Sequence, residues 1–296
     1  MSGLLTKGVK KEEINELYKV INWDDYEEKL NEIKEFFDLF KQNKYLNTIQ
    51  SWGKSLSDVL SDGPTMNMMF ILYRNWLELG KPKGFSSESM KIYNKNIFII
   101  LDRSFYEYLS NQWKGSSDST IARNIDSYEK KLETEENGLL KPIPENYWST
   151  LIDTLFKKNM INGKLIAKGI LAPLVYYYNC LKGISGDGYE NPGEIDHIMP
   201  QALWASSNVT DKEAIQNNVF NLALLPKSIN GPKKDQVLSS ITNENMKALI
   251  SKFEEIDERD FAKYSNISKY TELKEFREKL YIDVIEKKRK EILNNS

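Results

Sequence analysis

Apolar residues recur at steps of three and four along most of the chain, the spacing that is typical of amphipathic helices. The clearest case covers residues 26–40, where the other side is charged, so we expect the apolar side to face a core. Asp24 precedes this helix as a predicted N-cap. The apolar side consists of Tyr26, Leu30, Ile33, Phe37 and Phe40.

The same spacing predicts helices elsewhere in the first 181 residues. Ser61-Asp62-Gly63-Pro64 is expected to break the chain before one of them, and residues 86–113 form either one long helix or two. Pro173 is expected to kink the last of them. The predicted helices cover residues 11–20, 47–59, 65–79, 86–113, 120–132, 146–159 and 164–181.

The second half of the chain interrupts this helical pattern with two short apolar runs. One surrounds Ile195 and Ile198 and ends at Pro200, and the other covers residues 219–225 and ends at Pro226. Both have the length of strands. A helix with a break near Gly231 is predicted over 227–240, and others over 210–216, 243–255 and 271–293. The last of these carries a predicted apolar stripe of Leu273, Phe276, Leu280 and Val284.

These patterns predict a mainly α fold in which a small strand–strand–helix core is inserted into a helical body. Residues 183–193 contain four glycines and one proline, so we expect a linker there. The expected organisation is a helical domain over 1–182, a core over 183–240, and C-terminal helices over 241–296 that pack on the body.

Composition adds limits on compartment and partners. Apolar residues make up 40% of the 296 residues, enough for a core, but no apolar run is long enough for a membrane span and the N-terminus lacks a signal peptide. The single cysteine, Cys180, excludes an internal disulfide. We therefore expect a cytoplasmic protein. The net charge of −2 counts mildly against a nucleic-acid binder.

Candidate chemistry gathers around the first apolar run. His197, the only histidine, follows Asp196, and Asn221 and Asn230 come later. A histidine of near-neutral pKa is a suitable general base, and carboxylate and amide oxygens suit Mg²⁺ or Mn²⁺. Neighbouring strand residues point to opposite faces, so Asp196 and His197 can share a site only if a twist or bulge lies there. His197 could instead be an ordinary buried histidine, and Asn230 a turn residue.

The motifs in this region resemble those of a known superfamily. The Asp-His-Ile-Met-Pro-Gln box of residues 196–201 and the nine-residue step from Asn221 to Asn230 are similar to the motif of HNH (ββα-metal) endonucleases. The Asn-Leu-Ala-Leu-Leu-Pro run of residues 221–226 more narrowly resembles the C-terminal nuclease half of GmrSD-type, modification-dependent restriction enzymes.

The resemblance implies a metal-dependent endonuclease that cuts DNA in restriction or anti-phage defence. It implies His197 as catalytic base and Asp196 and Asn230 as ligands of Mg²⁺ or Mn²⁺. It also implies a catalytic role for Asn221, which orients the histidine or braces the loop; a purely structural role is the alternative. DNA contacts are expected from basic residues beside the motif, namely Lys227, Lys233 and Lys234.

Partners and an alternative function also follow. Enzymes of this type join or pair the nuclease with a nucleotide-hydrolysing domain that carries an Asp-Gly-Gln-Gln-Arg-type motif, which this sequence lacks. Such a sensor domain or subunit is therefore an expected partner besides DNA. The alternative, suggested by the low net charge, is a helical DNA- or protein-binding module with an inactive HNH-like core.

Overall fold

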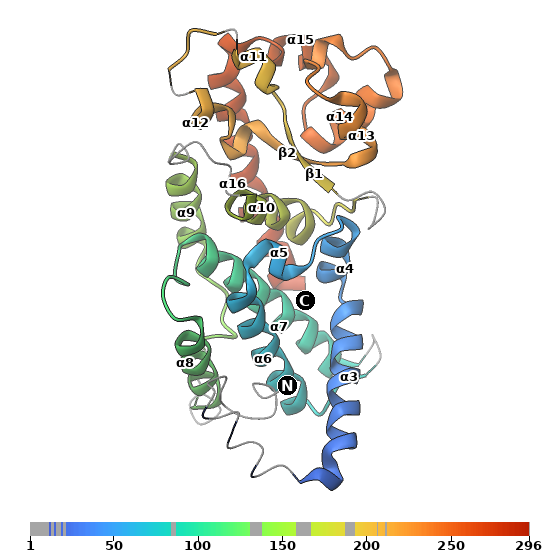
Figure 1. Cartoon of the computed structure of the whole chain (residues 1–296), viewed down its shortest axis with the longest axis vertical. Coiled ribbons are helices and arrows are strands. Elements are labelled where there is room, and N and C mark those ends of the chain that lie inside the picture. Colours follow the sequence, from blue (N-terminus) through green and yellow to red (C-terminus); the bar gives the residue numbers. More distant parts are fainter. Residues whose placement is uncertain are drawn as a thin grey trace. The chain divides into compact units, whose positions relative to one another are not determined.

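The chain is mainly helical, as predicted, and its described part contains one sheet of two strands (Figure 1). Within that part, no helix combines the length and the apolar character that a membrane span needs. Of the predicted helix over 11–20, most lies outside the described residues. The computed structural model describes residues 22–83, 87–130, 138–157, 167–186, 193–205, 207–210 and 212–295, together with residues 12, 15 and 19.

Contacts divide the chain into two compact units. Unit 1 consists of Met1–Asn47, Leu60–Pro144 and Glu291–Ser296, and unit 2 consists of Thr48–Val59 and Glu145–Lys290. Unit 2 contains every residue of the predicted site.

Helix α6 is the centre of unit 1, because it packs against both α7 and α8. The rings of Tyr73 and Trp76 on α6 also meet Phe36 of α3, with centroid distances of 5.3 and 6.0 Å. Among the described residues from 22 to 130, which include the segment 48–59 of unit 2, the α-helices are α3 (Tyr26–Gln42), α4 (Lys44–Ser51), α5 (Leu56–Leu60), α6 (Asp62–Glu78), α7 (Glu88–Leu109) and α8 (Ser117–Lys130).

Several predicted helix details in this part were wrong. Phe36, not Phe37, lies in the core beside Ile33 and Phe40. Asp24 lies within a 3-10 turn, Trp23–Asp25, and therefore does not cap α3. The predicted break before α6 is its first turn, where Pro64 is tolerated because the first backbone N–H groups of a helix need no partner within it.

Two other predicted helices differ from the observed ones. Residues 47–59 do not form one helix but contribute to α4 and α5, with a turn at Gly53, whose φ of 65° suits glycine. Residues 86–113 contain the single helix α7, whose N-terminus is capped by Ser87: its hydroxyl accepts a hydrogen bond from the backbone N–H of Met90 at 3.2 Å.

Unit 2 places the two strands among short helices. Strand β2 packs against α10 and α14, and α13 contacts both strands and α14. The α-helices and strands are α9 (Glu145–Lys157), α10 (Ala167–Val175), β1 (Gly193–His197), α11 (Gln201–Ala205), α12 (Lys212–Gln216), β2 (Leu222–Pro226), α13 (Lys227–Lys233), α14 (Glu244–Glu254), α15 (Phe261–Tyr264) and α16 (Tyr270–Asn295). A π-helix, Tyr176–Leu181, continues α10, and 3-10 turns cover Val219–Asn221, Leu238–Ser240, Glu258–Asp260 and Ile267–Lys269.

The sheet pairs β1 and β2 antiparallel in an unbroken register from Gly193↔Pro226 to His197↔Leu222. Of the two conditions that we named for Asp196 and His197 to share a site, a twist or a bulge, the bulge is therefore absent from this ladder. The second predicted strand was too long, because residues 219–221 form a 3-10 turn. The third predicted element was also too long, since α13 ends at Lys233 and Lys234 adopts a φ of 48°.

Trp52 anchors the beginning of β1. The backbone N–H of Gly193 donates to the carbonyl of Trp52 at 2.9 Å, and the indole N–H donates to the carbonyl of Ile184 at 3.0 Å. A Cβ atom at position 193 would overlap the indole ring, so only glycine allows this approach. These contacts explain why residues 48–59 belong to unit 2.

Helix α16 buries a different stripe from the one predicted. Its core side is Leu273, Arg277, Tyr281 and Ile285, whereas Phe276 is 42% exposed. The prediction failed because it counted only apolar residues, and Arg277 is fully buried.

Candidate active site

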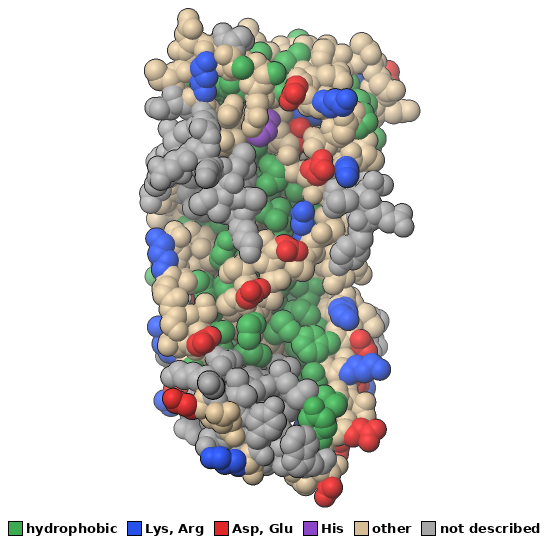
Figure 2. Space-filling model, viewed as in Figure 1, with side chains coloured by type: hydrophobic (Ala, Val, Ile, Leu, Met, Phe, Trp, Pro, Cys, Tyr) green, Lys and Arg blue, Asp and Glu red, His purple; other side chains and the backbone are tan. Residues whose placement is uncertain are grey.

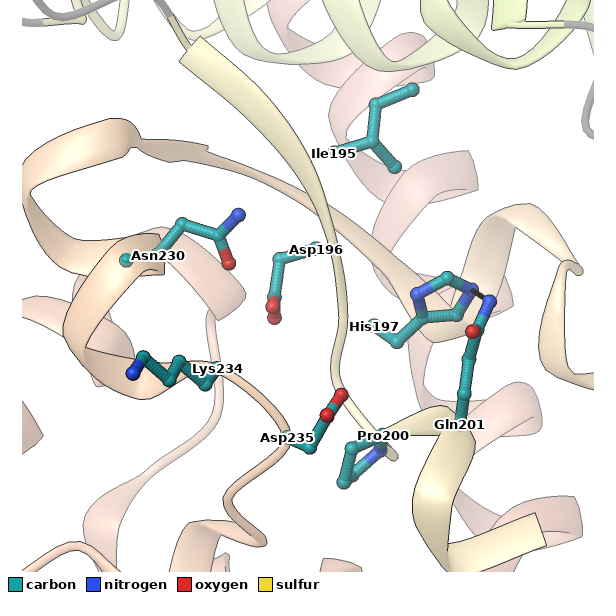
Figure 3. A pocket seen from close by; sticks show the side chains of 9 residues that line it. Ile195, Asp196, His197, Pro200, Gln201, Asn230, Lys234 and Asp235 are labelled. Atoms are coloured by element: carbon teal, nitrogen blue, oxygen red, sulfur yellow. Dashed lines mark hydrogen bonds between the residues drawn. The ribbon is translucent and has the colours of Figure 1, made fainter. Parts of the chain in front are cut away.

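Four of the predicted site residues, Asp196, His197, Asn230 and Lys234, border one open pocket of about 330 Å³. Asp196 and His197 come from β1, and Asn230 comes from α13 (Figure 3). Because α13 begins directly after β2, the sheet brings residues that are more than thirty positions apart in the chain to one edge. The remaining lining residues are Ile195, Pro200, Gln201, Gly231 and Asp235.

The side chains approach this pocket from two sides of β1. Figure 3 shows the Asp196 carboxylate and the Asn230 amide on one side of the strand and the imidazole of His197 on the other. This is the alternation that a regular strand imposes. The imidazole is half-buried, and the purple patch in Figure 2 shows that it reaches the surface.

His197 is held in a state that suits a base. Burial lowers the pKa of the imidazole below its usual value, although the hydrogen bond with Asn217 and the charge of Asp196 oppose this shift. The ring is therefore neutral at pH 7. Its Nε2 lies 2.9 Å from Oδ1 of Asn217 and 3.5 Å from the side-chain nitrogen of Gln201. Asn217 was not predicted as a site residue.

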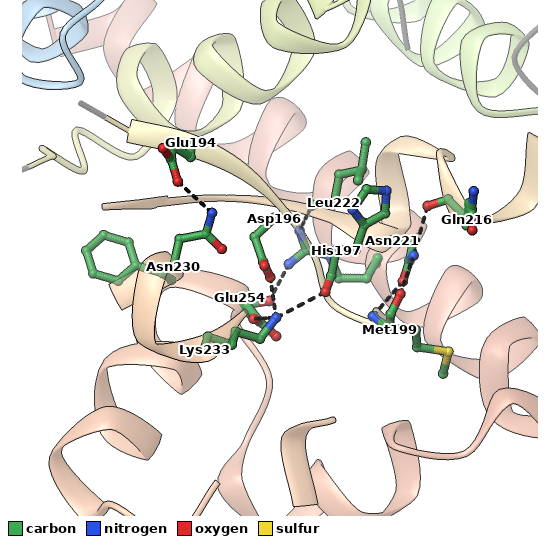
Figure 4. Close-up of polar contacts among 12 residues, drawn as sticks. Glu194, Asp196, His197, Met199, Gln216, Asn221, Leu222, Asn230, Lys233 and Glu254 are labelled. Carbon is green, nitrogen blue, oxygen red and sulfur yellow. Dashed lines mark hydrogen bonds and ion pairs between the residues drawn. The ribbon is translucent and has the colours of Figure 1, made fainter. Parts of the chain in front are cut away.

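A buried lysine, Lys233, forms an ion pair with Asp196. The ammonium of Lys233 donates a hydrogen bond to Oδ2 of Asp196 and another, of 3.0 Å, to the backbone carbonyl of His197 (Figure 4). It also forms an ion pair of 2.9 Å with Oε1 of Glu254. All three charged side chains are buried, Lys233 and Glu254 completely.

The charges of this cluster depend on one another. Burial alone would lower the pKa of Lys233, but the carboxylates of Glu254 and Asp196 raise it overall, so the ammonium stays charged. Burial raises the pKa of Glu254, and Lys233 opposes this effect. Lys233 thus fixes the position of one carboxylate oxygen of Asp196, whose side chain lines the pocket.

The three lysines predicted to contact DNA have different environments. Lys227 and Lys234 are exposed, and Lys234 lines the pocket. Lys233 is completely buried, so the DNA contact predicted for it is wrong: an ammonium that is enclosed by two carboxylates cannot reach a phosphate. Sequence spacing could not separate these neighbours, because only the end of α13 determines which of them faces inward.

Asn221 holds the loop that follows β1. Its side-chain oxygen accepts a hydrogen bond from the N–H of Met199 at 2.9 Å, and its side-chain nitrogen donates to the carbonyls of Met199 at 3.1 Å and Gln216 at 2.9 Å. Asn221 is fully buried and does not line the pocket. These contacts match the loop-bracing role and do not fit direct action on a substrate.

Asn230 presents an oxygen to the pocket. Its side-chain nitrogen donates to Oε2 of Glu194 at 2.8 Å, which directs the amide oxygen away from Glu194 (Figure 4). Figure 3 shows that oxygen directed toward Asp196. Glu194 therefore orients Asn230.

The donor set is compatible with a hard divalent cation. No group of three His, Cys, Asp or Glu side chains arranged as metal ligands occurs among the described residues. However, Mg²⁺ commonly retains several waters and binds through only one or two protein oxygens. The side-chain oxygens of Asp196 and Asn230 fit that requirement, and the carboxylate of Asp235 lines the same pocket.

Arg277 links two of the elements that surround the site. Its guanidinium donates to the carbonyl of Glu254 at 2.5 Å and to the carbonyl of Leu222, which is paired with His197 in the sheet, at 3.2 Å. A single buried side chain therefore joins β2 to the end of α14. No motif in the sequence indicated this role.

Comparison with known protein families identifies the class of protein as a restriction-type nuclease. The model of the family described as GmrSD restriction endonucleases, C-terminal domain, matches residues 145–294, about half of the chain. The chain belongs to this family, which confirms the resemblance to the C-terminal nuclease half of GmrSD-type enzymes. The matched region nearly coincides with the longer segment of unit 2. No curated protein and no solved structure matches the chain.

Proposed function

We propose that this chain is an HNH-type, metal-dependent endonuclease that hydrolyses DNA phosphodiester bonds in the restriction of foreign DNA. The main support is that a neutral imidazole and two oxygen donors, from Asp196 and Asn230, border the same pocket. The order β1, β2, α13 agrees with a ββα-metal core, in which two strands and the following helix supply these groups.

In this mechanism His197 is the general base. The neutral ring accepts a proton from a water molecule while the water oxygen attacks the phosphorus of the scissile phosphate. The bond from phosphorus to the 3′-oxygen breaks in the same step, and the leaving 3′-oxygen takes a proton from water. Asp196 and Asn230 would hold Mg²⁺ or Mn²⁺, which when bound supplies positive charge to the phosphate in the transition state. Lys233 keeps Asp196 oriented, and Asn221 holds the loop beyond the base.

The DNA backbone would be met by exposed lysines at the pocket rather than by a large basic face. Lys234 lines the pocket and Lys227 lies exposed at the start of α13. With so few contacts, we expect weak binding with a shallow dependence on salt, since each neutralised phosphate contributes a slope of about −0.9 in log K against log salt. Recognition would then depend on a partner.

The first test is nicking of supercoiled plasmid DNA. Wild-type protein should convert plasmid to the open-circular form with Mg²⁺ or Mn²⁺ and not with EDTA. His197→Ala should lose about 10²- to 10⁴-fold in rate, the usual contribution of a general base. Equal cutting by both proteins would remove His197 from the mechanism.

The inactive-core alternative gains support from Lys233, which already neutralises Asp196. Binding of Mn²⁺, measured by electron paramagnetic resonance in the absence of DNA, separates the two proposals. The endonuclease proposal expects binding by wild type and by Asn230→Asp, which retains an oxygen ligand, and weaker binding by Asn230→Ala. Absence of both Mn²⁺ binding and nicking would establish the inactive core.

The biological role is tested with DNA substrates. Family membership suggests defence against foreign DNA, and a nucleotide-hydrolysing domain or subunit is the partner that we propose. Cleavage of modified and unmodified DNA by the chain alone should be similar, because none of the pocket residues is suited to reading a modified base. A preference shown by the isolated chain would contradict the need for a separate sensor.

A further inference from the structure

We infer that Asn217 is a positioning residue that keeps the proton of the neutral His197 ring on Nε2 and so leaves Nδ1 as the proton acceptor. This inference rests on the proposed function, in which His197 is the base. It assigns a role to a residue outside every motif of the sequence, and it specifies which ring nitrogen takes the proton from water.

The hydrogen bond between the two side chains carries the assignment. Oδ1 of Asn217 lies 2.9 Å from Nε2 of His197, and Asn217 is only 4% exposed. An amide oxygen can only accept, so the ring nitrogen that faces it must carry the proton. Among the described residues, none forms a hydrogen bond with Nδ1, and Figure 3 shows this nitrogen facing away from Gln201, on the side of Asp196.

Gln201 presents a donor instead of an acceptor to the same ring nitrogen, but its contact is weaker. Its side-chain nitrogen, a donor, lies 3.5 Å from the same Nε2, and the residue is exposed. A hydrogen bond donated by this nitrogen would require an Nε2 atom that carries no proton. The contact with Asn217 is shorter and buried, where a hydrogen bond is stronger and an unmet group more costly. Asn217 therefore decides the tautomer.

Asn217 can act as a fixed acceptor because the chain around it is held on both sides. It follows α12 at the turn before β2. Two side chains bind the carbonyls of the residues before it: the Tyr270 hydroxyl donates to Ile215 at 3.0 Å, and the Asn221 side chain donates to Gln216 at 2.9 Å. After it, the side chain of Asn218 accepts from the N–H of Phe220 at 3.0 Å.

The same bond assists the proposed chemistry. When Nδ1 takes the proton from water, an N–H bond forms as the O–H bond breaks, and the ring becomes an imidazolium with a donor on each nitrogen. The amide oxygen of Asn217 already accepts from Nε2, so it favours the charged ring without moving. Hydrogen bonds to charged donors are stronger than those between neutral groups.

The experiment uses the fact that the chain has one histidine. Long-range ¹H–¹⁵N correlation spectra of ¹⁵N-labelled full-length protein then contain a single imidazole, recorded at a pH where the ring is neutral. Wild type should show one tautomer, protonated at Nε2, with that proton visible in water. Asn217→Leu should give a mixture and lose the protected proton signal. Asn217→Asp keeps an acceptor and should retain the wild-type tautomer.

Gln201→Ala is the matched control, because it removes the other carboxamide near Nε2 and should leave the tautomer unchanged. A wild-type ring protonated at Nδ1, or an Asn217→Leu spectrum identical to wild type, would overturn the inference. If circular dichroism shows that Asn217→Leu is unfolded, the wild-type and Asn217→Asp spectra still decide.

Nicking rates supply the second readout. Partners that orient a metal-bound imidazole typically contribute about 10- to 100-fold in activity, and we expect a similar factor for the base. Asn217→Leu should lose that factor, and Asn217→Asp should lose less. Because the spectra need neither DNA nor metal, a wild-type protein that does not nick would refute the proposed function while the tautomer of His197 is still measured. Equal nicking by Asn217→Leu and wild type would refute the positioning role alone.

Discussion

Replacing Lys233 by methionine should destabilise the strands of the site far more than the same replacement at its exposed neighbour Lys234. The ammonium lies between the buried carboxylates of Asp196 and Glu254 and also binds the carbonyl of His197. Methionine keeps most of the volume but leaves two buried acids facing one another. Removing one partner of a buried ion pair typically costs about 3–5 kcal/mol, because the remaining charge stays uncompensated.

The pH dependence of this loss has a definite sign. Burial raises the pKa of Glu254, and without Lys233 it rises further. Because the pKa of Glu254 in folded wild type is about 8, the acid is protonated in the folded state of both proteins below that pH, and its ionisation does not distinguish them. Above that pH, folded wild type ionises Glu254 beside Lys233, whereas the folded variant must keep it protonated, so the cost of the substitution increases with pH. The difference between wild type and Lys233→Met should therefore be larger at about pH 9 than at about pH 6.

Hydrogen exchange measured by mass spectrometry tests this locally, since the chain has two compact units and one global unfolding energy is not defined. A loss of about 3–5 kcal/mol accelerates exchange in peptides covering β1 and α13 by roughly two to three and a half orders of magnitude. Lys234→Met, at the adjacent exposed position, should change the free energy of local opening by less than about 0.5 kcal/mol.

The double variant Lys233→Met with Glu254→Met separates charge from packing. It removes the buried pair together, and such replacements are often nearly neutral. Most of the lost protection should return. The reasoning would be refuted if Lys233→Met exchanged no faster than Lys234→Met, or if the double variant were as unstable as the single one.

Three further predictions follow from the same contacts. The lowered pKa of His197 means that the base stays unprotonated to a lower pH than usual, so the rising limb of the nicking rate should have an apparent pKa below about 6.5; a midpoint above that value contradicts it. Gly193→Ala should cost about 1–3 kcal/mol through overlap with Trp52, measured as faster exchange in β1, and unchanged exchange would show that the indole can move. Arg277→Lys should lose about 1–3 kcal/mol, seen as faster exchange in β2 and α14, because one ammonium cannot satisfy both carbonyls that the guanidinium binds; wild-type exchange would refute this.

The sequence predicted those parts of the site that depend on local pattern. Two short apolar runs that end at proline predicted β1 and β2, and the family motif assigned His197, Asp196 and Asn230, which now border one pocket. The roles of these residues stay predictions. Helix existence was also predictable in most of the described chain, since amphipathic spacing is a local property.

The parts that were missed depend on partners distant in sequence. Lys233 and Lys234 are indistinguishable as neighbours in the sequence, and Glu254, which pairs with the buried one, lies on α14. Asn217 has no motif around it, and its role depends on the position of β1 twenty residues earlier. On α16 the buried stripe passes through Arg277, so counting apolar residues placed the core side one position away from the true one.

The contribution of residues 48–59 to unit 2 has a practical consequence for anyone who isolates the nuclease part. The indole of Trp52, fully enclosed, lies against Gly193 at the start of β1 and meets the ring of Phe253 at 6.0 Å, next to Glu254. A fragment cloned from residue 145 onward would keep every family motif and yet lack Trp52 and the rest of residues 48–59. We expect such a fragment to express poorly, and supplying residues 48–59 as a separate peptide to restore it.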